Sequence, residues 1–183
     1  MSSADWSAER AERHLLSLEL FGMRFGLERM RRLLTALDSP QHRFESIHVV
    51  GTNGKSSVAR MTASILERHG YRAGAYLSPH LVSFAERVRV SEADIAPDDF
   101  GAAVGRAVGA AELVRRAAPG EEQVTQFELL TAAALDELAR REVEVAVVEA
   151  GLGGRHDATN VLPSRVQVLT SVGLEHTRWL GSP

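Results

Sequence analysis

The sequence predicts an α/β fold in which a mainly parallel sheet is flanked by helices. Three observations predict it. Apolar, β-branched runs of strand length recur at residues 47–50, 143–148 and 166–172. Segments with apolar residues at helical spacing separate these runs, which is the pattern of βαβ units. The runs are nearly continuously apolar, as expected of parallel strands that are buried on both faces.

Helical spacing of apolar residues occurs in five segments, which are residues 7–20, 27–37, 55–70, 97–118 and 125–140. The first two lie within residues 1–40, which we expect to form a helical N-terminal segment that covers an edge of the sheet.

Shorter patterns predict the remaining strands. The alternation of residues 87–90 predicts an edge or hairpin strand. Residues 72–77 predict a short strand that ends at Ser78-Pro79-His80, because proline cannot continue a central strand.

Composition bounds the class of protein. The chain has 183 residues, a length that suits one domain, and its net charge of −3 gives no general case for nucleic-acid binding. It has no cysteine, which excludes disulfides and thiolate catalysis. No apolar run approaches the roughly 20 residues that span a bilayer, and the N-terminus does not resemble a signal peptide. We therefore expect a cytoplasmic protein with neither a membrane nor a nucleic-acid partner.

A phosphate-binding loop follows the first strand, in the order Gly51, Thr52, Asn53, Gly54, Lys55, Ser56 and Ser57. Small residues allow backbone N–H groups to converge on an anion, the following helix adds the positive end of its dipole, and the lysine reaches the outer phosphates. The fold class is therefore P-loop NTPase-like. Val49 stands where the full pattern has its first glycine, so this is a shortened form. The alternative is a Gly-Asn turn with an exposed lysine.

Four polar segments lie just beyond the carboxyl ends of expected strands, which are residues 51–57, 78–80, 149–160 and 175–176. In open α/β sheets that edge binds ligands, so these segments are expected to meet around a phosphate. Glu149 ends an apolar strand and is a hard oxygen ligand for Mg²⁺, with an ion pair to Arg155 as the alternative.

The remaining polar positions are more ambiguous. Residues 151–160 are rich in glycine, so their backbone can approach a ligand, or they form a mobile surface loop. His80 is either a loop-packing residue or a site residue. Four further histidines have no supporting pattern and are interpreted as structural or surface residues, namely His14, His42, His48 and His69.

These blocks resemble the folylpolyglutamate synthase/dihydrofolate synthase family, within the ATP-dependent amide ligases that include the Mur ligases. The resemblance rests on residues 51–55, 78–81, 127–131, 149–160 and 176–181. It implies that ATP phosphorylates a substrate carboxylate and that the amine of L-glutamate attacks the acyl phosphate. The acceptor would be dihydropteroate, a folate, or both.

The resemblance also implies roles for individual residues. ATP contacts fall on Gly51 through Ser57, and catalytic roles on Lys55, Glu149 and His176. Two Mg²⁺ ions are implied, with metal ligands at Ser57, Ser78, Glu149 and His176, although the choice between Ser56 and Ser57 stays open. Pterin or folate contacts are implied at Arg24, Phe25, Thr125, Gln126, Phe127, Glu128, His156, Asp157 and Ala158.

The chain departs from the family pattern in some respects. His156 stands where an apolar residue is expected, and Glu175 where aspartate is usual. The family continues with a lysine-bearing segment and a C-terminal Rossmann-like domain. Residues 1–183 are thus expected to form most of an N-terminal ATP-binding domain, as a fragment or truncated product that is inactive alone.

Two questions stay open, which are the function and the oligomeric state. A Mur-type ligase and a non-catalytic nucleotide-binding module are the alternative functions. The block at residues 153–160 favours a folate ligase over a Mur ligase, and the implied metal ligands disfavour a non-catalytic module. The oligomeric state is not determined, with a monomer expected for a full-length protein.

Overall fold

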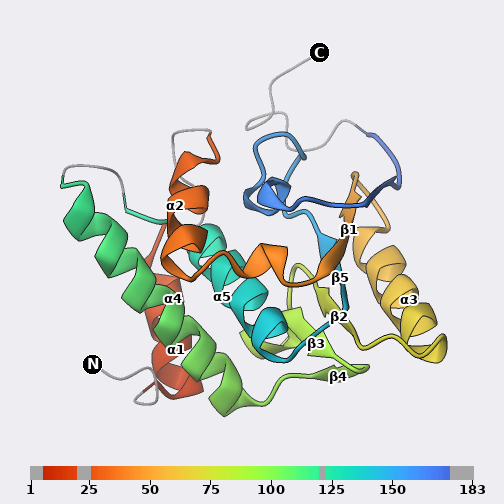
Figure 1. Ribbon diagram of the computed structural model, residues 1–183, viewed down its shortest axis with the longest axis horizontal. Coiled ribbons are helices and arrows are strands. Elements are labelled where there is room, and N and C mark those ends of the chain that lie inside the picture. Colours follow the sequence, from red (N-terminus) through yellow and green to blue (C-terminus); the bar gives the residue numbers. More distant parts are fainter. Residues whose placement is uncertain (1–5, 20–25, 120–122, 174–183) are drawn as a thin grey trace.

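The computed structural model describes residues 6–19, 26–119 and 123–173. Within these ranges the chain forms one six-stranded sheet with helices on both faces (Figure 1). The helices are α1 (Ala8–Ser17), α2 (Glu28–Ala36), α3 (Lys55–Arg68), α4 (Pro97–Ala117) and α5 (Gln126–Arg140). The strands are β1 (Glu45–Val50), β2 (Ala73–Tyr76), β3 (Val88–Val90), β4 (Ala93–Asp94), β5 (Val145–Glu149) and β6 (Val166–Leu169). Short 3₁₀ turns are η2 (Pro40–His42), η3 (Phe84–Arg87) and η4 (Ala158–Val161).

The sheet is mainly parallel, as predicted. Its strand order is β4-β3-β2-β5-β1-β6. The central strand β5 pairs in parallel with β1 and β2, and β1 pairs in parallel with β6. The predicted edge strand β3 is antiparallel to β2. The carboxyl ends of β1, β2, β5 and β6 therefore lie along one edge of the sheet, where the predicted site residues follow them.

Helix α3 covers one face of the sheet, and the other helices lie on the opposite face (Figure 1). Helix α5 is the centre of the larger layer, since nearly all of its side chains are buried between the sheet and helices α1, α2 and α4. The α3 side has a smaller core, in which Val49, Ala59 and Val147 are fully buried. The main hydrophobic core therefore lies on the α5 face.

Helix ends follow the expected local chemistry. The Ser7 side chain accepts from the Arg10 N–H at the start of α1, and Pro97 is at the first turn of α4. Thr125 and Glu128 form a capping box at the start of α5. None of the helices within the described ranges is long and apolar enough to cross a membrane.

Several details differ from the sequence prediction. Helices α1 and α2 pack against α4 and α5 and do not cover an edge of the sheet, because their apolar faces are buried in the helical layer. β4 was not predicted, because two exposed residues carry no periodic signal. β6 ends at Leu169 instead of Val172, because residues 170–173 leave the strand to bond to the phosphate loop.

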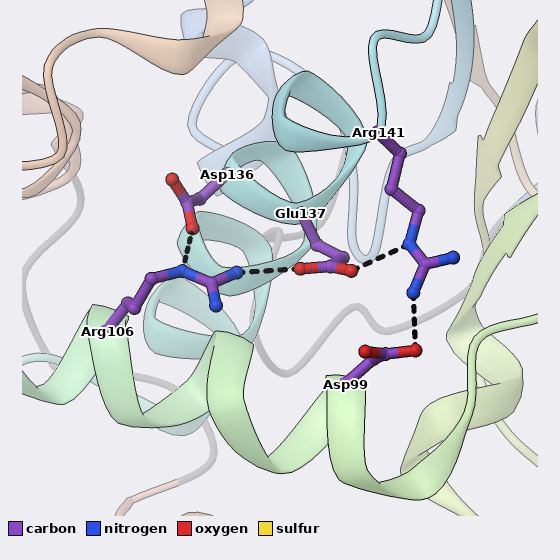
Figure 2. Close-up of polar contacts among 5 residues, drawn as sticks. All are labelled: Asp99, Arg106, Asp136, Glu137 and Arg141. Atoms are coloured by element: carbon purple, nitrogen blue, oxygen red, sulfur yellow. Dashed lines mark hydrogen bonds and ion pairs between the residues drawn. The ribbon is translucent and has the colours of Figure 1, made fainter. Parts of the chain in front are cut away.

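Charged side chains join α4 to α5 (Figure 2). Arg106 on α4 donates to Asp136 over 2.5 Å and to Glu137 over 2.7 Å. Arg141 donates to the other oxygen of Glu137 over 2.7 Å and to Asp99 over 2.5 Å. Both carboxylates on α5 are buried, so each needs the guanidinium partners that the network supplies.

Candidate functional site

The phosphate loop joins β1 to α3 at the carboxyl edge of the sheet. Gly51 has a φ of 135°, and a Cβ there would lie 2.2 Å from the side-chain oxygen of Thr170 and 2.8 Å from the carbonyl of Ser171. Only glycine fits this backbone conformation and this close approach. Gly54 is the left-handed cap of α3, with a φ of 82°. The loop therefore delivers the chain directly into the N-terminus of a 14-residue helix.

Residues 170–173 hold the loop from the β6 side. Thr52 N–H donates to the carbonyl of Ser171 over 2.7 Å, and Asn53 N–H donates to the Ser171 hydroxyl over 3.1 Å. Gly173 N–H donates to the Thr52 hydroxyl over 3.0 Å. The backbone N–H groups of Thr52 and Asn53 thus shape the loop, and the first turn of α3, whose N–H groups lack helical acceptors, is the end suited to an anion.

Lys55 and Ser56 open α3 and face the loop and the sheet edge. The Lys55 ammonium donates to the Thr52 carbonyl over 3.0 Å, which keeps a cation over the phosphate loop. The Ser56 hydroxyl lies 2.9 Å from Glu149 Oε1 and 3.2 Å from the Ser78 carbonyl. Ser57 is exposed. Of the two serines, it is Ser56 that contacts the predicted metal carboxylate.

Glu149 lies at the end of β5 and is only 2% exposed. Its second oxygen accepts from the Ser78 N–H over 2.9 Å, so the carboxylate joins β5 to the turn after β2. The Ser78-Pro79 peptide bond is cis. Burial raises the pKa of Glu149, and the Ser78 N–H, the Ser56 hydroxyl and the Lys55 charge oppose that rise. Glu149 bonds to Ser56 and Ser78, and the alternative ion pair with Arg155 is not formed.

The donor set fits Mg²⁺ bound together with a nucleotide. A buried carboxylate, a hydroxyl and a backbone carbonyl, all hard oxygen donors, converge at Glu149, Ser56 and Ser78. Within the described ranges, no three His, Cys, Asp or Glu side chains are grouped to hold a metal ion. Mg²⁺ commonly takes one or two carboxylates and completes its shell with phosphate oxygens and water. A single carboxylate beside a phosphate-binding loop is consistent with that coordination.

Three predicted site residues lie outside the described residues, namely Arg24, Phe25 and His176. Their predicted roles in pterin binding and in a second metal site stay predictions. The described structure brings together Lys55, Ser56, Ser78 and Glu149.

Three of the predicted pterin residues make bonds within the fold. The Glu128 carboxylate accepts from the Thr125 N–H over 2.9 Å and from Arg29 over 2.8 Å. The Gln126 amide donates to the Leu15 carbonyl over 2.8 Å, which attaches α1 to α5. Thr125, Gln126 and Glu128 therefore position the start of α5 in this structure.

Phe127 lies between that helix start and the glycine-rich loop. A Cβ on Gly151 would lie 2.4 Å from the Phe127 ring, so the loop backbone packs directly on the aromatic face. The ring of Tyr76 on β2 is 6.3 Å away between centroids. Phe127 thus connects the glycine-rich loop to the main core.

Asp157 organises the glycine-rich loop. Its Oδ2 accepts from the Leu152 N–H over 2.8 Å, and its Oδ1 accepts from the Thr159 N–H over 3.0 Å and from the Thr159 hydroxyl. Asp157 and Ala158 are buried, whereas His156 is exposed. The loop is therefore a turn with a hydrogen-bonded polar centre.

His48 is a structural residue, one of the two interpretations that the sequence left open, and its partner could not be predicted. This histidine is buried in β1, and its Nε2 lies 2.8 Å from the Thr159 hydroxyl. The available signal was a polar residue inside an apolar strand, the same signal that identified Glu149.

His80 is a loop-packing residue in this structure. Its Nδ1 accepts from the Arg87 Nε–H over 3.0 Å. Its ring packs on that of Phe84, with 4.1 Å between the ring centroids. Burial, followed by the charge of Arg87, lowers the pKa of His80. The Nδ1 atom of His80 is thus the acceptor of the bond from Arg87.

Comparison with known proteins finds relatives among the dihydrofolate synthases and folylpolyglutamate synthases. No family model matches the chain. The dihydrofolate synthase/folylpolyglutamate synthase of Bacillus subtilis is 36% identical over 163 residues, which cover 88% of this chain and 37% of that protein. Escherichia coli FolC in complex with DHPP and ADP superposes with a TM-score of 0.87 at 34% identity, over 100% of this chain and 42% of that one.

A second solved structure agrees. Mycobacterium tuberculosis folylpolyglutamate synthase complexed with ADP has a TM-score of 0.88 at 36% identity, over 96% of this chain and 39% of that one. The chain thus spans about two fifths of the length of these relatives. The sequence identities of 34–36% and the TM-scores of 0.87 and 0.88 extend over most or all of this chain, so the chain belongs to the folylpolyglutamate synthase/dihydrofolate synthase family.

Proposed function

We propose that this chain is the ATP-binding part of an amide ligase that joins L-glutamate to dihydropteroate or to a folate. The observation that carries the proposal is the convergence of Lys55, Ser56 and Glu149 at the carboxyl edge of the sheet. A cation, a hydroxyl and a buried carboxylate at the N-terminus of α3 are the groups that bind a nucleoside triphosphate with its Mg²⁺. The presence of ADP in two solved relatives supports the same assignment.

In the proposed reaction, a substrate carboxylate oxygen attacks the γ-phosphorus of ATP, and ADP leaves. The amine of glutamate then attacks the acyl carbon, an amide forms, and inorganic phosphate leaves. Lys55 balances negative charge on the transferred phosphoryl group, and the first turn of α3 binds the phosphates that remain. No protein nucleophile is required, which is consistent with the absence of cysteine.

Mg²⁺ would be held by Glu149, the Ser56 hydroxyl and Ser78 and would neutralise phosphate charge. Ser78 donates its N–H to Glu149 and thereby orients the carboxylate. The predicted contribution of His176 to a second metal site belongs to the same proposal. The acceptor would lie beside Phe127 and the loop at residues 151–160, next to the nucleotide.

Calorimetric titration of the chain with ATP, with and without Mg²⁺, tests the proposal. We expect saturable binding that Mg²⁺ strengthens and that Lys55→Ala weakens by about tenfold or more, the effect of removing a charge-assisted contact. Arg68→Ala, in the last turn of the same helix, is the matched control and should bind like the parent chain. Absence of nucleotide binding in a folded chain would refute the proposal.

The acceptor class is tested separately by thermal shift with ADP present. Dihydropteroate or a folate should raise the midpoint of unfolding, whereas a UDP-linked muropeptide should not. The reverse result would favour the Mur-type alternative.

A further inference from the structure

We infer that His48 is a positioning residue that sets the glycine-rich loop, residues 151–160, against the strand that carries the phosphate loop. The tie runs from His48 through Thr159 to Asp157. That this loop contacts the acceptor rests on the proposed function. The tie itself rests on the described contacts alone.

The location of His48 in β1 makes the tie possible. Ile47 and Val49 belong to the core beneath α3, so the intervening residue points to the opposite face of the sheet. On that face η4 packs against α2 and α5, and it carries Thr159, which is fully buried. His48 and Thr159 are 111 residues apart in sequence and 2.8 Å apart between Nε2 and Oγ1.

The direction of each hydrogen bond follows from the donors available. Asp157 accepts the hydroxyl hydrogen of Thr159, because both oxygens of this carboxyl group already act as acceptors of backbone N–H groups. The Thr159 oxygen can then bond to His48 only as an acceptor, so His48 donates from its Nε2–H. Burial lowers the pKa of His48, although the charge of Asp157 opposes this, and the neutral imidazole with its hydrogen on Nε2 satisfies the chain of bonds.

Asp157 extends the tie to both ends of the loop. One oxygen holds the Leu152 N–H near the start of the loop, and the other holds the Thr159 N–H near its end. A shift of Thr159 away from β1 would therefore move the whole turn.

Strand β1 also leads into the phosphate loop, close to His48. Only Val49 and Val50 separate His48 from Gly51, so one short stretch of β1 supports both the phosphate loop and the glycine-rich loop. A displacement of about 1 Å between two reacting groups can cost on the order of a hundredfold in rate. A buried hydrogen bond from β1 therefore helps to hold the spacing between nucleotide and acceptor.

Two pairs of variants in the 183-residue chain test the inference. His48→Phe removes the donor and keeps a ring, whereas His48→Gln retains an N–H near the position of Nε2. Thr159→Val removes the hydroxyl at constant shape, whereas Thr159→Ser retains it. If His48→Phe fails to fold, the Thr159 pair still decides the question.

The first readout is amide hydrogen exchange at Leu152 and Thr159, the two N–H groups bonded to Asp157. We expect exchange to accelerate about tenfold in His48→Phe and Thr159→Val, as for loss of one buried hydrogen bond. In His48→Gln and Thr159→Ser it should stay near the parent rate. The amide of Ala146 in β5, away from the loop, should be unchanged in all four. Equal exchange in all variants and the parent chain would overturn the inference.

The second readout separates the inference from the proposed function. Dihydropteroate should bind about tenfold more weakly to Thr159→Val, with ADP affinity unchanged. If the parent chain binds neither ligand, the proposed function fails, and the exchange rates still decide the role of His48. If the parent binds both and Thr159→Val binds both equally well, His48 does not position the acceptor loop.

Discussion

Ser56 and Glu149 are hydrogen-bonded across the carboxyl edge of the sheet, with 2.9 Å between the hydroxyl and Oε1. Ser56 comes from the first turn of α3 and Glu149 from the last residue of β5. The bond therefore joins the nucleotide side of the site to the carboxylate that fits Mg²⁺. It also identifies which of two adjacent serines faces the carboxylate.

We expect Ser56→Ala to weaken Mg²⁺-dependent ATP binding by about tenfold, because it removes a hydroxyl ligand and a partner of Glu149. Ser57→Ala is the matched control, since its side chain is exposed and should be tolerated. Titration with ATP in Mg²⁺ and in EDTA measures both effects. A larger loss in Ser57→Ala would assign the metal contact to Ser57 instead.

Glu149→Gln should weaken Mg²⁺-dependent binding and yet stabilise the ligand-free chain at neutral pH. Its amide oxygen can accept from the Ser78 N–H, and its NH₂ can donate to Ser56, whose hydrogen turns to the Ser78 carbonyl. Every polar partner thus stays satisfied without a buried charge.

The pH dependence of this stabilisation has a definite sign. Burial raises the pKa of Glu149. The Glu149 carboxyl group therefore keeps its proton in the folded chain at a pH at which the unfolded chain has lost it. The resulting stability is fully present below the unfolded pKa of about 4.5 and is lost as the pH rises through the folded pKa. Thermal unfolding between pH 4 and pH 8 should show Glu149→Gln gaining over the parent chain with rising pH. A constant difference would contradict the burial argument.

Gly51→Ala should destabilise the chain by about 1–3 kcal/mol, because the new Cβ meets Thr170 and Ser171 at a φ that disfavours L-residues. ATP binding should fall with it, since those contacts shape the phosphate loop. Gly109→Ala is the control, because it lies in α4 with no atom near the added Cβ and should stabilise by about 0.5–1 kcal/mol. Urea unfolding measures both. Equal stability of the Gly51→Ala chain and the parent would refute the steric argument.

Arg106→Leu should cost about 3 kcal/mol of unfolding free energy, because it leaves Asp136 buried without a cation and leaves Glu137 with Arg141 alone (Figure 2). Arg115→Leu on the same helix breaks an exposed pair with Glu112, in which the side chains are 59% and 48% exposed, and should cost less than about 1 kcal/mol. Denaturant midpoints compare the two. Similar costs for both variants would mean that the network adds little to the packing of α4 on α5.

Much of the fold follows from local pattern. The β-branched runs predict β1 and β5, and apolar residues at helical spacing predict α3 and α5. Proline and glycine mark where several helices and strands begin or end. The site was also partly predictable, because a phosphate loop and a carboxylate at the end of an apolar strand carry signals within a few residues. Gly51, Lys55 and Glu149 were found in this way.

Other features depend on tertiary structure. Nothing local distinguishes Ser56 from Ser57, and the bond of Glu128 to Arg29, 99 positions away, has no local signal. His48 gains a role only when strand order brings β1 beside the turn that carries Thr159. Local patterns specify periodicity and backbone conformation, whereas these bonds depend on the register of β1 against β5 and on how η4 packs against α2 and α5. The sequence by itself therefore determined the elements and the chemistry they carry, and only the tertiary structure decided which side chains share that chemistry, because hydrogen bonds form over about 3 Å in space whatever the separation along the chain.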